Sequence, residues 1–147
     1  MTKKLIFTAL NCLSFIAGKS QSSEVFKTSA GAIQGYDPVS YLMEKKAIKG
    51  NESLRFNWKG ADWFFSSKAN LDSFRLNPGK YEPQFGGYCA YGMAEGHKAA
   101  TDPQAWTLLD GKLYLNYDQQ VLNTWQKDRS ANIVKAEKNW PRIKDKD

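Results

Sequence analysis

Three side chains that can ligate a soft metal lie within nine residues near the centre of the chain. They are Cys89, Met93 and His97, and His97 is the only histidine in the sequence. A thiolate, a thioether and an imidazole together suit Cu(I) better than zinc or magnesium. On a helix, Cys89 and Met93 are neighbours, whereas His97 lies about 12 Å from Cys89. One ion can therefore contact all three only if the chain bends at Gly92 or Gly96.

The same residues have two other interpretations. Cys89 and Met93 are also adaptable core-filling side chains, in which case His97 lies exposed on the following loop. In a thiol enzyme, Cys89 is the nucleophile and His97 the base, and the amides of Gly86 and Gly87 at a helix N-terminus lower the pKa of the thiol. The sequence offers no third group to orient the histidine, and it has no nucleophile-elbow or phosphate-loop motif. It therefore favours binding over catalysis.

Aromatic residues beside Cys89 offer another kind of site. Tyr88 and Tyr91 are three positions apart, so they share one face of a helix that includes both. Together with tyrosines and a phenylalanine from nearby turns, they could line a groove for a small apolar or planar ligand. The alternative is that most of these rings close the core of a domain without a disulfide.

The N-terminus predicts export to the periplasm or secretion. Residues 1–20 combine a short basic start with an apolar run at 5–18 and small residues at its end, which is the pattern of a signal peptide. The run is shorter than the roughly 20 residues of a membrane span, so we expect no stable membrane insertion after cleavage. An uncleaved anchor is the alternative. Cys12 lies in this segment, which makes Cys89 the one thiol expected in the mature protein.

The charge of the chain argues against a nucleic-acid partner. The sequence contains 21 lysines and arginines against 15 aspartates and glutamates, a net charge of +6. Three of the lysines lie in residues 1–20, so the mature chain retains 18 basic side chains and a net charge of +3. These charges are interspersed with acids, whereas a nucleic-acid binder gathers them on one face. We interpret them as a solvated surface.

Two hairpins are expected from the strand signals. Apolar residues alternate with polar ones over 54–58, as in a half-buried strand, and the apolar run 63–65 follows a short turn. The Asp110-Gly111 pair between 105–109 and 112–116 is the strongest hairpin signal in the chain. Each strand contributes one large side chain to the expected core: Trp58, Phe64, Trp106 and Leu113.

Helices are expected at four places, each marked by a capping or terminating residue. They begin at Asp37, at Ser66 or Ser67, near Gly87 and at Asp118. The third is expected to end at Glu95 before Gly96, and the last opens a C-terminal helical region. Helices mixed with antiparallel hairpins, without β-α-β alternation, indicate a compact single domain of the α+β class.

Several short motifs together resemble the YHS domain, a small module that often accompanies metal-handling proteins. The resemblance is carried by Asp37-Pro38-Val39, Phe64-Phe65-Ser66-Ser67, Phe74, Pro78, Tyr81, Gly86-Gly87-Tyr88-Cys89-Ala90-Tyr91, Asp102-Pro103, Ala105-Trp106 and the run from Asp110 to Tyr117. The second half of this set is similar to exported, stand-alone YHS proteins of bacteria. The resemblance implies a YHS-like domain at residues 31–141, followed by a polar tail at 142–147. It implies a compact α+β fold rather than a defined activity.

Three thiols of the metal-associated YHS pattern are absent from this chain. Where that pattern has cysteines, the sequence has Ser40, Ser66 and Asn70. Hydroxyl and amide groups are poor ligands for soft metals, so the usual metal site is expected to be lost. We interpret Ser66 instead as a helix N-cap.

The combined hypothesis is an exported binding or accessory module of the YHS type. Its leading form binds a soft metal such as copper through Cys89, Met93 and His97. A small-molecule or protein-interaction module without metal is the alternative, with Tyr88 and Tyr91 as ligand-binding residues. A thiol-dependent enzyme that uses Cys89 is the least favoured of the three.

Overall fold

The computed structural model describes residues 23–147, so the predicted signal peptide at 1–20 lies outside the described residues. Within the described part, three two-stranded antiparallel sheets combine with six α-helices. The predicted α+β class is therefore confirmed. No helix within 23–147 has both the length and the apolar character needed to cross a bilayer.

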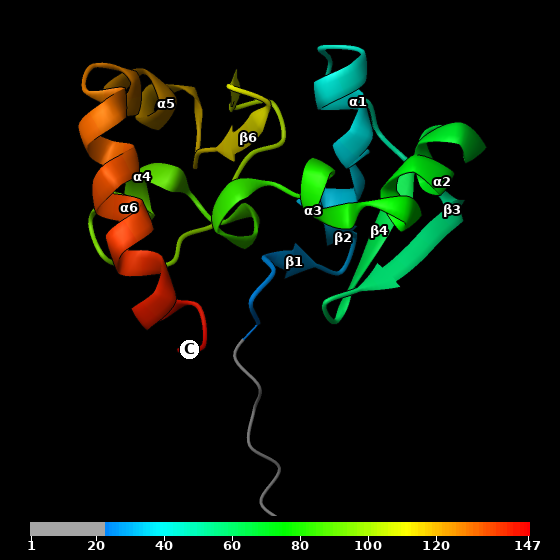
Figure 1. Cartoon of the computed structure of the whole chain (residues 1–147), viewed down its shortest axis with the longest axis horizontal. Coiled ribbons are helices and arrows are strands. Elements are labelled where there is room, and N and C mark those ends of the chain that lie inside the picture. The colour runs from blue at the N-terminus through cyan, green and yellow to red at the C-terminus, as the bar shows by residue number, and fades with distance from the viewer. Residues whose placement is uncertain (1–22) are drawn as a thin grey trace, which may run out of the picture.

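The first half of the described chain builds two hairpins, three α-helices and a short 3-10 helix, η1 (Figure 1). In order, the elements are β1 (Lys27–Thr28), β2 (Gly31–Ala32), η1 (Ile33–Gly35), α1 (Pro38–Met43), β3 (Asn51–Trp58), β4 (Ala61–Phe65), α2 (Lys68–Leu76) and α3 (Pro78–Tyr81). Strands β3 and β4 pair with Phe56 opposite Trp63, which confirms the first predicted hairpin.

The second half is mostly helical and contains the other predicted hairpin. Its elements are η2 (Gln84–Gly87), α4 (Ala90–Ala94), β5 (Trp106–Leu109), β6 (Lys112–Leu115), α5 (Gln119–Gln126) and α6 (Arg129–Ile143). Asp110 and Gly111 both have positive φ, 50° and 73°, as the predicted two-residue turn requires. Figure 1 shows α4 and α6 on the side of the molecule away from the β3–β4 hairpin.

Helix starts follow the capping signals except at two places. The carboxylates of Asp37 and Asp118 accept from the amides two and three residues on, both at 2.8 Å, so these two predictions are confirmed. Ser67 caps α2 by accepting from the Asn70 amide at 3.1 Å. The interpretation of Ser66 as the N-cap is therefore wrong, because its side chain donates to Asp37 instead.

The helix expected from Gly87 begins later. Phe85, Gly86 and Gly87 have φ values of 56°, 63° and 84°, which lie outside the right-handed helical region. Cys89 becomes the N-cap of α4, and the first helical residue is Ala90. The predicted end is confirmed, since Glu95 is the C-cap.

Two hydrophobic cores meet at the β5–β6 hairpin. The first contains residues of the β3–β4 hairpin and α2, and the second contains residues of α4, α5 and α6. Successive side chains of a strand point to opposite faces, so Leu113 and Leu115 enter the first core while Tyr114 enters the second. Of the other predicted core residues, Phe64 is buried, and Trp58 and Trp106 are partly buried against the first core.

Candidate functional site

Cys89 lies buried at the start of α4, where it contacts two polar groups. Its sulfur accepts from the Gly92 amide at 3.4 Å and donates to the Asn116 side-chain oxygen at 3.5 Å. The same oxygen accepts from the Tyr91 amide at 3.1 Å. Asn116 is fully buried, and its side-chain nitrogen has no hydrogen-bond partner among the described residues. The thiol therefore sits beside an amide with unused donor capacity.

Met93 follows one turn later, as predicted from the spacing. Its amide donates to the Cys89 carbonyl at 2.9 Å. The side chain is fully buried in the second core, where it makes the apolar contacts expected of a core methionine. Asn139 of α6 donates to the Met93 carbonyl at 2.9 Å and fixes the two helices together.

His97 is exposed, but the chain bends back before it. Gly96 has φ 93°, its amide donates to the Met93 carbonyl, and the His97 amide donates to the Gly92 carbonyl. This pair of bonds is a Schellman termination, which reverses the chain at a glycine. The imidazole Nε2 comes within 3.4 Å of the point that a Cβ on Gly92 would occupy. The bend that a shared metal site requires is therefore present at Gly96.

A ready-made ligand cluster is not seen in the described part of the chain. Among residues 23–147, no three histidine, cysteine, aspartate or glutamate side chains come together as metal ligands would. Cys89 and His97 both lie beside Gly92, with the thiol buried and the imidazole exposed. A common ion would require the sulfur to turn away from Asn116.

Tyr88 and Tyr91 do not share a helical face, so that premise of the predicted groove is wrong. Tyr88 precedes α4 in extended conformation, with φ −71° and ψ 159°. Its ring packs between Phe26 and Trp140, and its hydroxyl donates to the Ser23 carbonyl at 2.8 Å. Tyr91 is partly buried against the second core. Tyr88 instead ties the N-terminal segment to α6.

Ser40, Ser66 and Asn70, where the resemblance to the YHS pattern predicts a lost metal site, gather around a buried carboxylate. One oxygen of Asp37 accepts from the Ser66 amide at 2.9 Å, the Ser66 hydroxyl at 2.7 Å and the Asn70 amide nitrogen at 2.7 Å. Ser40 donates its hydroxyl to the Asp37 carbonyl at 2.8 Å. Hydrogen bonds between protein groups therefore occupy this position completely.

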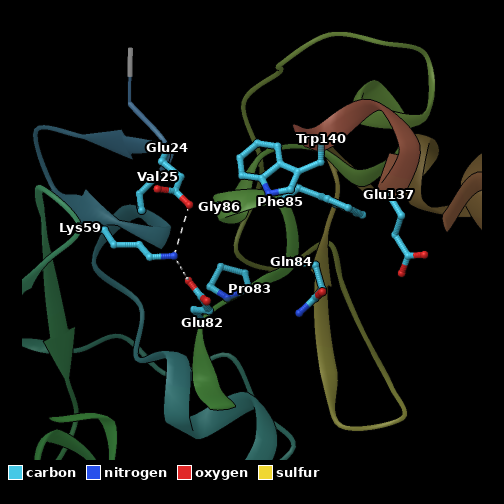
Figure 2. Close-up of a pocket in the computed structure, with 10 residues that line it drawn as sticks. All are labelled: Glu24, Val25, Lys59, Glu82, Pro83, Gln84, Phe85, Gly86, Glu137 and Trp140. Carbon is cyan, nitrogen blue, oxygen red and sulfur yellow. Dashed lines mark hydrogen bonds and ion pairs between the residues drawn. The ribbon is translucent and has the colours of Figure 1, made fainter. Parts of the chain in front are cut away.

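A pocket that the sequence did not indicate lies where the N-terminal segment, residues 82–86 and α6 meet (Figure 2). Its volume is ≈200 Å³. Lys59, in the turn of the β3–β4 hairpin, places its ammonium 3.3 Å from a Glu24 oxygen and 3.4 Å from a Glu82 oxygen. Glu137 contributes a further carboxylate from α6.

Burial raises the pKa of Glu82, the strongest of the effects acting on this carboxyl. The negative charge of Glu24 raises it further, and the ammonium of Lys59 acts in the opposite direction. Burial disfavours the charged form of an acid. The pKa of Glu82 is raised on balance because the ammonium of Lys59 does not fully offset the effect of burial.

Phe85 and Trp140 form the aromatic part of the pocket, with ring centroids 6.2 Å apart in an edge-to-face arrangement. Gly86 permits the close packing behind them. A Cβ at Gly86 would lie 1.8 Å from the Glu24 carbonyl oxygen, so no other residue fits here without moving the backbone. The Phe26 amide also donates to the Gly86 carbonyl at 2.9 Å. The glycine therefore fixes the N-terminal wall of the pocket.

Comparisons with known proteins give no relatives: no family model, no curated protein and no solved structure matches the chain. The resemblance to the YHS domain therefore stays a prediction.

Proposed function

We propose that this chain is an exported binding module whose ligand occupies the pocket beside Lys59. One observation carries the proposal. Gln84 and Glu137 line the pocket, and their side chains make no hydrogen bond or ion pair with the described residues, while Phe85 and Trp140 supply apolar surface. Ligand sites combine apolar walls with a few polar groups that are free to bind.

The lining favours binding over catalysis. No serine, threonine, cysteine or histidine of the described chain is among the residues that line the pocket. Lysine and carboxylate side chains can also act as nucleophiles, but the Lys59 ammonium and the carboxylates of Glu24 and Glu82 are engaged in ion pairs. The carboxylates and the ammonium are instead suited to recognising charge and orienting a ligand.

A screen of small metabolites by ligand-observed NMR tests this proposal. In Gln84→Trp, the larger side chain fills the pocket, and we expect every ligand that binds the wild-type protein to be lost. Gln104→Trp adds the same side chain at an exposed turn position and should bind as the wild type does. Ligands retained by Gln84→Trp, or no ligand for the wild type, would reject the pocket as the binding site.

Copper binding is a second candidate, supported by the turn at Gly96. This turn brings His97 back beside Gly92, the residue whose amide contacts the Cys89 sulfur. If the thiol turned from Asn116, Cys89, Met93 and His97 would supply a soft donor set for Cu(I). The exposed imidazole would then be the ligand that an incoming ion meets first.

Competition with a colorimetric Cu(I) chelator tests the copper proposal on protein prepared without an affinity tag. We expect Cys89→Ala to abolish copper uptake and Met93→Leu to weaken it. Met43→Leu is the matched control, because Met43 is 63% exposed at the end of α1. Uptake that is unchanged in Cys89→Ala, or absent in the wild type, would contradict the proposal.

A further inference from the structure

The charges around the pocket favour a positively charged ligand. Glu24, Glu82 and Glu137 bring three carboxylates to its lining, against the single ammonium of Lys59. The carboxylates of Glu24 and Glu82 share that ammonium at 3.3 and 3.4 Å, which leaves each of them able to accept further bonds. Glu137 has no ion-pair partner among the described residues. An anionic ligand would meet more repulsion than attraction here.

The aromatic side chains suit the same ligand. The face of an indole or phenyl ring attracts cations within about 6 Å, and tryptophan does so most strongly. Trp140 lies at the pocket together with Phe85, as Figure 2 shows. A cation held by the carboxylates can rest its apolar part on these rings. A neutral ligand would contact the aromatic rings but would gain no charge attraction from the carboxylates.

The backbone of α6 adds an acceptor at the same place. Pro141 lies inside this helix, and proline has no N–H to give to the carbonyl four residues earlier. That carbonyl belongs to Glu137, which lines the pocket. It is left without its usual helical donor.

We infer that the ligand of this pocket is a small organic cation, an amine or ammonium group on a short apolar chain. The inference rests on the proposed function and specifies its ligand class. The pocket volume of ≈200 Å³ is below the roughly 300–1,000 Å³ of sites for drug-sized ligands. The ligand is therefore compact.

Protein-observed NMR of the full chain tests the inference, with the Trp140 indole N–H as reporter. The probes are 1,4-diaminobutane and choline, each paired with a neutral molecule of similar shape, 1,4-butanediol and 3,3-dimethyl-1-butanol. We expect both cations to shift the Trp140 signal, and the neutral partners to bind roughly tenfold more weakly, a factor that corresponds to about 1.4 kcal/mol.

A charge-neutralising variant tests whether the preference for cations depends on a carboxylate of the pocket. Glu137→Gln removes one carboxylate and should weaken diamine binding several-fold. Glu44→Gln makes the same change of net charge at the exposed C-cap of α1 and should leave the affinity unchanged. Equal weakening in both variants would show an effect of overall charge and would overturn the inference.

The remaining outcomes separate the inference from the proposed function. If neutral molecules shift the Trp140 signal as strongly as the cations do, the cation inference fails and the binding pocket stands. The same holds if the cations are silent and other metabolites from the screen shift that signal. If no small molecule shifts the Trp140 signal, both the cation inference and the proposed binding function fail.

Discussion

Asp37 and Cys89 occupy the same position in two short helices, since each is the buried N-cap of its helix, α1 or α4. The Asp37 carboxylate accepts four hydrogen bonds, at 2.8, 2.9, 2.7 and 2.7 Å. The Cys89 sulfur has one acceptor contact at 3.4 Å and one donor contact at 3.5 Å. Beside it, the Asn116 amide nitrogen has no partner in the described chain.

The difference shows which of the two regions has capacity for a ligand. A ligand at Asp37 would have to replace short bonds to a buried carboxylate, and each such bond is stronger than a neutral one. A ligand at Cys89 would replace only two long contacts, and the sulfur that makes them is a weak donor and a weak acceptor. The first region is therefore structural, and the second is the one where a metal could be accommodated by a modest rearrangement.

Removal of the Asp37 carboxylate should have the largest effect. Asp37→Ala leaves the buried Val39 amide, and the partly buried Ser66 amide and Asn70 side chain, without their acceptor, and a buried unsatisfied group costs roughly 1–3 kcal/mol. We expect the free energy of unfolding in urea to fall by about 4 kcal/mol. Asp118→Ala is the matched control, because this cap accepts one bond from Val121, and its loss should cost about 1 kcal/mol. Similar losses in both would break the comparison.

Asn116→Ala tests the polar group that accompanies the thiol. The variant removes the acceptor of the Tyr91 amide, and it also removes the nitrogen that lacks a partner. The two effects oppose each other, so we expect a loss of about 2 kcal/mol, near the middle of the range for one unsatisfied donor. Asn123→Ala, at an exposed position of α5, should change stability by less than about 0.5 kcal/mol. A neutral Asn116→Ala would show that the two effects cancel and that the amide gives this region no net stability.

Cys89→Ala should cost less, about 1 kcal/mol, because its cap contact is long and sulfur accepts hydrogen bonds weakly. Chemical denaturation with unchanged m-value would establish this value as a stability change. A loss as large as that of Asp37→Ala would mean that the thiol is a strong cap. The proposed turn of Cys89 towards a metal would then be too costly.

Local signals were sufficient to predict most helix caps and two of the three hairpins in the described chain, β3–β4 and β5–β6. Asp118 and the Asp110-Gly111 turn act through atoms only a few residues away, so their roles can be predicted from adjacent sequence. Ser66 could not be assigned in this way, because its partner Asp37 lies 29 residues earlier. The start of α4 was missed for a similar reason, since Gly86 is packed against the Glu24 backbone.

The candidate pocket could not be predicted from the sequence either, because it also forms from residues that lie far apart in the chain. Its charged residues, Glu24, Lys59, Glu82 and Glu137, come from four separated segments, and no local spacing connects them. The Gly86-Gly87 pair suggested backbone amides for catalysis. In the structure, Gly86 instead allows the Glu24 backbone to approach closely. Only the cluster at Cys89, Met93 and His97 was local enough to be identified as a group.

The smallest expected effect on stability is that of Gly92→Ala, which probes whether His97 stays folded back over α4. Alanine normally stabilises a helix relative to glycine by about 0.4–1 kcal/mol. Here the new Cβ would lie 3.3 Å from both the Ala99 Cβ and the His97 carbonyl oxygen, and 3.4 Å from the His97 Nε2, so the turn that carries the imidazole must give by a few tenths of an ångström.

We therefore expect Gly92→Ala to gain less stability than Gly79→Ala, whose new Cβ would meet only an Asn77 oxygen at 3.9 Å. The His97 ring signals should shift in the first variant and stay unchanged in the second. If copper binds as proposed, Gly92→Ala should also weaken it, because the turn that carries the imidazole is displaced. Gly92→Ala with the full helical gain and unshifted His97 signals would show that His97 does not rest beside Gly92, and the link between the imidazole and the thiol would be lost.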